Sequence, residues 1–173
     1  MSGDDPRGAL TGLGRAELGE RLGGFVYGTI VVLSVIVTGL KAFPHGLWHV
    51  ALLVAVTTVV FWLAHVYAHG IAFSIGRDEH LSLKELDQIG RREASIVGAG
   101  VPPEAALVLG ATGLLSDQVA TWLAFGLGLV VLGAVGIVFA RVEHLGRGRT
   151  ALAILANLAL GLVLIGLKVF VVH

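Results

Sequence analysis

Three adjacent residues, Pro102, Pro103 and Glu104, combine a carboxylate with two prolines inside an apolar stretch of the chain. Carboxylates at membrane depth are costly and usually face a bundle interior, where they serve ion or substrate pathways. A proline inside a helix removes one hydrogen bond and clashes with the carbonyl four residues earlier. Broken helices near the bilayer midplane often build ion or substrate sites. We therefore expect Glu104 to line a polar path; the alternative is a packing kink, with Glu104 protonated or bonded to a neighbouring helix.

Two histidines, His65 and His69, lie four residues apart in the preceding apolar stretch. This spacing puts both imidazoles on one face of a helix, where they can relay a proton or bind one metal ion. By helical rise, Glu104 lies roughly 6–10 Å from the depth of His65, a gap that one water could bridge. We expect His65 to share the polar path with Glu104. A metal ion at His65 and His69 is a lesser alternative, as is interfacial anchoring of these histidines beside Trp62 and Tyr67.

One further polar residue, Asn157, lies in the last apolar stretch on a stripe that includes Ala153 and Gly161. Small residues allow helices to approach closely in lipid, and an asparagine can hydrogen-bond across such a contact. We interpret the stripe as a packing seam and Asn157 as a candidate neighbour of Glu104. No nucleophile–base set or phosphate-binding loop is present, so the sequence argues against an enzyme and indicates no other cofactor.

The overall composition fits a protein that resides in a membrane. Of the 173 residues, 55% are hydrophobic and 14% are charged, against about 25% charged residues in a soluble domain. The formal net charge is zero, which gives no indication of a nucleic-acid partner. The lack of cysteine excludes disulfides, thiol catalysis and cysteine-ligated metal sites.

Five stretches are long and apolar enough to cross a bilayer, which takes roughly 20 residues as a helix. The sequence therefore predicts an all-α, polytopic membrane protein with a five-helix transmembrane bundle. We expect the third helix to be broken at Pro102 and Pro103. The predicted spans are 22–40, 47–75, 94–115, 118–140 and 150–172.

Basic residues are distributed unevenly among the connecting segments. Of the twelve Lys and Arg residues, three precede the first span, four lie between the second and third, and three lie between the fourth and fifth. The positive-inside rule then puts the N-terminus in the cytoplasm and the C-terminus outside the cell membrane. We expect a polar, flexible cytoplasmic tail at 1–20 and a single transmembrane domain at 21–173.

The longest connecting segment carries the pattern of a surface helix over 82–93. Ser82 and Glu85 have the spacing of a capping box, in which each side chain bonds the backbone of the other residue. Asp87 and Arg91 are four residues apart with the favourable order of charges. We predict an amphipathic helix at the cytoplasmic surface with a structural role, which leads into the third span.

The beginning of the first span, Arg21-Leu22-Gly23-Gly24-Phe25-Val26-Tyr27-Gly28, resembles the first helix of the endolysosomal and bacterial potassium-channel family. That family carries an Arg-x-x-x-Phe-Ser-Asp-Gly signature, of which Arg21, Phe25 and Gly28 match and Ser-Asp does not. The segment Phe61-Trp62-Leu63-Ala64-His65 is similar to the aromatic pair and histidine of the family's second helix.

The resemblance implies an oligomeric cation channel whose first helix lines the pore. The three matching residues would organise the inner end of that helix. The family has six helices per repeat, against five spans expected here. The residues that would face the pore are Thr29, Val32, Leu33 and Ile36.

Three functions remain open from the sequence. The first is a channel- or transporter-like protein for a cation or proton, built as a homo-oligomer in the bilayer. The second is a membrane scaffold or accessory subunit, with Glu104 and Asn157 as internal contacts. The third is an intramembrane metal or redox protein built on His65 and His69.

Overall fold

A computed structural model describes residues 6–77 and 82–171, and every regular element in these ranges is a helix. Five of the helices are long and apolar enough to cross a membrane, which confirms the predicted class of multi-pass α-helical membrane protein. The remaining helix, α3, is too short to span. The bounds are α1 Pro6–Ala42, α2 Leu47–Arg77, α3 Leu83–Arg92, α4 Ala94–Ala111, α5 Asp117–Val142 and α6 Arg147–Val171.

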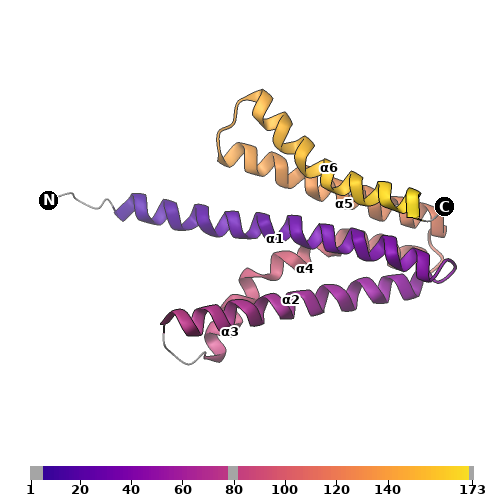
Figure 1. Ribbon diagram of the computed structural model, residues 1–173, viewed down its shortest axis with the longest axis horizontal. Coiled ribbons are helices and arrows are strands. Elements are labelled where there is room, and N and C mark those ends of the chain that lie inside the picture. The colour runs from indigo at the N-terminus through magenta and orange to yellow at the C-terminus, as the bar shows by residue number, and fades with distance from the viewer. Residues whose placement is uncertain (1–5, 78–81, 172–173) are drawn as a thin grey trace.

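The helices form a bundle in which α1 contacts every other helix and α4 packs against α1, α2 and α5. The long α1 has α2 and α3 on one side and α5 and α6 on the other (Figure 1). The helices converge where α1 turns into α2 and α4 turns into α5, which we call the tight end. They spread apart at the opposite end, which carries the N-terminal half of α1, α3 and the α5–α6 turn (Figure 1). We call this the basic end, after the Lys and Arg residues gathered there.

The interior of the bundle between these ends is apolar. Leu33 and Ile36 of α1 are fully buried against Leu107 of α4 and Phe125 and Leu132 of α5, within one continuous cluster. Glycines let the backbones approach closely enough to exclude voids. A Cβ atom at Gly110 of α4, for example, would overlap Leu47 of α2 and Ala120 of α5.

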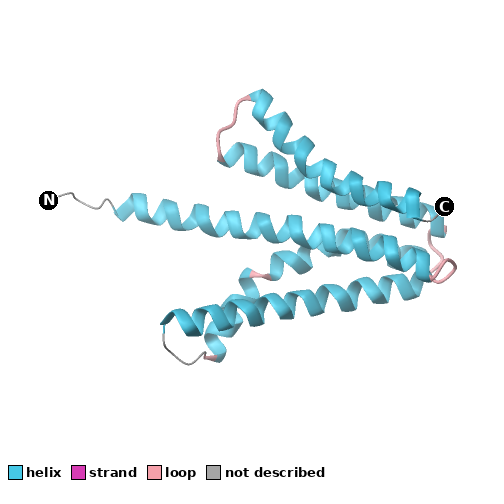
Figure 2. Cartoon of the chain, viewed as in Figure 1, coloured by secondary structure: helices cyan, strands magenta, loops and turns pink. Residues whose placement is uncertain are grey.

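The structure confirms the predicted surface helix. Ser82 caps α3 through its Oγ atom, which accepts from the Glu85 amide at 3.3 Å, while Glu85 accepts from the Ser82 amide at 2.9 Å. Arg91 donates to Asp87 at 2.9 Å. The chain then turns at Glu93 rather than running straight into the third span, and Figure 2 shows this turn as a short loop between α3 and α4.

Two predicted boundaries differ from the observed ones. The segment assigned to a flexible tail is helical from Pro6 onward, and residues 1–5 lie outside the described residues. Proline suits the first helical position, and Arg21 pairs with Glu17 one turn earlier at 2.8 Å. The third span ends at Ala111 rather than at 115, because the chain reverses at Gly113, whose φ of +79° suits glycine.

The expected break of the third span at Pro102 and Pro103 was wrong, because α4 is one helix from Ala94 to Ala111. The two prolines lack the amide donors that would bond the carbonyls of Gly98 and Ala99. A membrane helix tolerates such a loss when neighbouring helices support the turn. Here α1, α2 and α5 all pack on α4, and Pro103 is itself buried among them.

Candidate functional site

A cavity of about 550 Å³ opens at the basic end between α1, α2 and the α3–α4 turn. Two carboxylates, two imidazoles, a guanidinium and two aromatic rings contribute to its wall, and small residues of α1 leave space for it. Its volume suits a small-molecule or hydrated-ion site. The lining residues are Glu20, Gly23, Gly24, Tyr27, His65, His69, Ala72, Phe73, Ile89, Arg92, Glu93 and Ile96.

A contact between a histidine and a carboxylate joins α2 to the α3–α4 turn beside this cavity. Nδ1 of His69 on α2 lies 3.2 Å from Oε1 of Glu93, the residue that connects α3 to α4. The same nitrogen lies 3.2 Å from the carbonyl oxygen of His65. Both neighbours are acceptors, so Nδ1 of His69 carries the proton and Nε2 is left to accept another. Glu93 is the more enclosed partner, with 18% of its side chain exposed against 58% for His69.

His65 lies one turn deeper on the same face of α2. Its Nδ1 donates to the carbonyl oxygen of Phe61 at 2.9 Å, which leaves Nε2 as an acceptor. Its ring is packed against Tyr27 of α1, with the centroids 4.9 Å apart, and lies 6.5 Å from the ring of His69. The two imidazoles therefore lie one turn apart along α2, with His65 deeper in the bundle, and each ring is oriented by a backbone carbonyl.

The short helix α3 closes one side of the cavity. Nε1 of Trp62 donates to the carbonyl oxygen of Gly90 at 3.0 Å, which fastens the end of α3 to α2. Gly90 is buried, and a Cβ atom there would lie 3.3 Å from the Trp62 ring. Ile89 and Glu93 on either side of Gly90 are thereby held against the cavity.

Glu104 lies in a separate, smaller hollow of about 160 Å³ between α2 and α4. Thr58 of α2 shares this hollow, and the remaining lining is apolar or glycine. Its Oε2 atom is buried and has no hydrogen-bond partner within the described part of the chain. An ionised carboxylate without a partner is costly in an apolar environment. Glu104 therefore needs a proton, a cation or a polar group from another molecule.

The structure does not bring His65 and Glu104 together, contrary to the estimate from depth. His65 is level with Ile96 in the basic-end cavity, whereas Glu104 lies eight residues farther along α4, about 12 Å by helical rise. The estimate used rise per residue alone, which does not specify how far α2 and α4 are shifted along one another. The polar residue of α2 that does share the hollow with Glu104 is Thr58.

The other predicted polar residue, Asn157, lies on a different side of the bundle. It contributes to a hollow of about 380 Å³ between α1, α5 and α6, and its Nδ2 lies 3.2 Å from where a Cβ of Gly136 would be. This position fits the predicted packing seam and not a shared path with Glu104. Pro102 and Pro103 shape α4 beside Glu104, with Pro103 directed into the core.

A metal site at His65 and His69 lacks a third ligand. Within 6–77 and 82–171, no group of three His, Asp or Glu side chains converges as a metal site requires. Glu93 reaches His69 only, and the two rings are 6.5 Å apart with their Nδ1 atoms bonded to carbonyls. The described residues therefore supply no third ligand for the two histidines.

The residues carried by the family resemblance lie on α1 near the basic end. Arg21 pairs with Glu17, Phe25 lies against Gly98, and Gly28 packs on Ile96 of α4. The residues expected to face a pore are instead buried within the chain's own bundle. They are Thr29, Val32, Leu33 and Ile36, each no more than 1% exposed.

Sequence reasoning did not assign Tyr27, Glu20 or Arg92 to a site, although all three line the cavity with the predicted His65 and His69. One signal was available for Tyr27, since it is a polar aromatic residue within an apolar span, one turn from a Gly-Gly pair. Glu93 is the last residue of the surface helix predicted over 82–93. Its contact with His69 depends on the turn between α3 and α4, which the sequence pattern did not predict.

Comparison of the chain with protein families, with curated proteins and with solved structures finds no match.

Proposed function

We propose that this protein is channel- or transporter-like and moves a proton or small cation into the bilayer from the cavity at its basic end. The observation that carries the proposal is the contact between His69 and Glu93 inside that cavity, with His65 one turn deeper. The carboxylates of Glu20 and Glu93 favour cations, and the free Nε2 atoms of the two histidines accept protons.

The route continues along the seam between α2 and α4. These helices run antiparallel, so Thr58 lies beside Gly100, and Glu104 lies one turn beyond. Glu104 is eleven residues from Glu93, about 16 Å by rise, which is half of a hydrocarbon core of about 30 Å. Between His65 and Thr58 a gap of about 10 Å requires water or side-chain movement. Glu104 would receive the proton or cation that it lacks.

A second copy of the chain would complete the path. The hollow that holds Glu104 opens on the outer face of the bundle, between α2 and α4. Beyond it toward the tight end the interior is closed by apolar side chains such as Val50 and Leu107. A homo-oligomer that contacts through α2 and α4 would supply the other wall. This arrangement differs from the pore implied by the potassium-channel resemblance, because that pore would be lined by α1.

Flux measured in proteoliposomes tests the proposal. We expect Glu104→Gln to abolish most of the proton or cation flux, because glutamine is similar in size but cannot bind a proton or carry charge. Glu17→Gln is the matched control, since Glu17 is exposed and pairs only with Arg21. Flux that is unchanged in Glu104→Gln at normal protein stability would contradict the route.

A second candidate, an accessory or scaffold subunit, is favoured by the closed apolar interior and by the exposure of α6. The apolar part of α6 is only 6% buried, so most of that helix faces outward. In this case Glu104 would bond a polar group of a partner helix. Glu104→Gln would then reduce assembly or stability. Neither the wild-type protein nor the variant would give flux in proteoliposomes.

We also propose that the chain lies in the cell membrane with its basic end and N-terminus in the cytoplasm, and its C-terminus outside. The support is the positive-inside rule applied to the Lys and Arg residues at that end. Since the chain has no cysteine, single substitutions allow a direct test with a membrane-impermeant maleimide. In intact cells we expect Ser116→Cys at the tight end to be labelled and Ser82→Cys on α3 to be protected. The reverse pattern would invert the orientation.

A further inference from the structure

A hollow of about 500 Å³ lies at the basic end where α5 turns into α6, apart from the cavity with the two histidines. One side of it carries the guanidinium of Arg141 and the imidazole of His144. The other side is apolar and is formed by Ile137 and Ala140 of α5. The hollow thus offers positive charge at the end of a membrane-spanning helix and an apolar wall directly below it.

The backbone of this turn has an unusual conformation at His144. Its φ is +49°, and it is the one non-glycine residue with a positive φ in the described ranges. The turn is closed by the Leu145 amide, which donates to the carbonyl oxygen of Ala140 at 2.9 Å. Glycine is the usual residue at this position after a helix, because a side chain is unfavourable there. A residue held in such a conformation suggests a function for its side chain, and here the imidazole lines the hollow.

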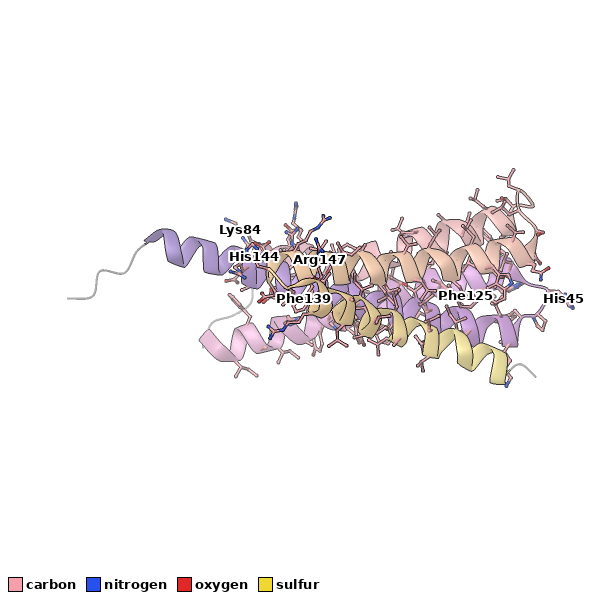
Figure 3. The ribbon with its side chains drawn as sticks, turned by 90° about the horizontal axis from the view of Figure 1, so that it is seen from above. His45, Lys84, Phe125, Phe139, His144 and Arg147 are labelled. Atoms are coloured by element: carbon pink, nitrogen blue, oxygen red, sulfur yellow. The ribbon has the colours of Figure 1, made fainter. Side chains whose placement is uncertain are left out.

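Within the described residues, two arginines at this turn have no anionic partner. Arg141 and Arg147 form no ion pair with any residue in the described part of the chain, and Figure 3 shows Arg147 and His144 at the same end of the bundle. The nearby carboxylate of Glu143 is paired with Arg15 of α1, at 3.4 Å. Among the described residues, no anion therefore pairs with the arginine of the hollow.

We propose that this hollow binds the phosphate group of an anionic phospholipid. Arginine is well suited to phosphate, and basic pockets between transmembrane helices recognise lipid headgroups. The apolar wall favours a lipid over a free anion, because Ile137 leaves 39% of its surface open to acyl chains. The positive-inside rule accounts for arginines at this end, but it does not account for the left-handed histidine beside them. The site is independent of the proposed cation path.

Lipid retention by the full-length protein, measured by native mass spectrometry, tests the site. Phosphatidylglycerol and phosphatidylcholine with the same acyl chains are the two probes. We expect phosphatidylglycerol to be retained preferentially and Arg141→Gln to weaken its binding about fivefold, the effect of one basic residue near a membrane surface. Arg149→Gln is the matched control, because it removes the same charge from the same end but does not line the hollow.

A second variant, His144→Gly, removes the imidazole while relieving the backbone, so the protein should fold normally and bind phosphatidylglycerol more weakly. Three outcomes would overturn the proposal. They are an equal loss of binding in Arg141→Gln and Arg149→Gln, equal retention of the two lipids, and full competition by inorganic phosphate, which would indicate a site for soluble anions. If His144→Gly folds and binds phosphatidylglycerol as well as the wild-type protein does, His144 is not part of the site.

Discussion

The two ends of the bundle differ in how the same helices meet. At the tight end, Gly110 lets α4 approach Leu47 of α2 and Ala120 of α5 so closely that no side chain fits between them. At the basic end, Gly23 of α1 has no atom within 4 Å of the position of its Cβ, and it borders the cavity instead. Gly110 thus serves close packing at the tight end and Gly23 leaves open space at the basic end, although another glycine near that end, Gly28, packs closely on α4.

The difference shows where polar side chains are tolerated in this membrane protein. In lipid, packing and hydrogen bonds hold helices together, so close contacts are made by small and apolar residues. The spread helices at the basic end leave a cavity, and His65, His69 and Glu93 line it. Glu104 lies between the two regions, deep enough to be partly buried but beside an open hollow. This intermediate position makes it the candidate for proton or cation transfer.

The largest difference in stability should come from adding a methyl group to a glycine at each end. Gly110→Ala puts a Cβ atom into Ala120, which cannot move aside, and into Leu47. Gly23→Ala meets nothing, and both changes carry the same gain in helix propensity. We expect Gly110→Ala to unfold more easily than Gly23→Ala by about 1–3 kcal/mol, the usual cost of overpacking a core. Thermal unfolding of the two variants in the same detergent measures this difference, and equal stability would mean that the tight end adapts as freely as the basic end.

Much of the fold could be predicted from the sequence because it depends on local patterns. Apolar length gave the five spans, and the capping box of Ser82 and Glu85 marked the start of α3 within one residue. The behaviour of Pro102 and Pro103 could not be predicted, because support from three neighbouring helices keeps α4 continuous. Local rules for proline do not include that support.

The candidate site was predicted only in part. The spacing of His65 and His69 indicated a shared face, which the cavity confirms. The partner Glu93 and the separation of His65 from Glu104 depend on how far α2 and α4 are shifted along one another, and a single sequence does not specify that shift. The positive φ of His144 could not be predicted either, because only a few per cent of non-glycine residues adopt one, even though histidine is among the enriched types.

A smaller loss of stability is expected at the basic end, where the hydrogen bond from Trp62 to Gly90 fastens α3 to α2. Trp62→Phe keeps an aromatic ring against Gly90 but removes the donor to its carbonyl oxygen, which should weaken the attachment of α3 by about 0.5–1.5 kcal/mol. Hydrogen exchange should then become faster in α3 and stay unchanged in α5, because the basic end opens without the tight end. Trp48→Phe serves as the control, since Trp48 is 58% exposed at the tight end. Faster exchange throughout α5 would show that the two ends unfold together, and unchanged exchange in α3 would show that apolar contacts alone hold that helix on the cavity.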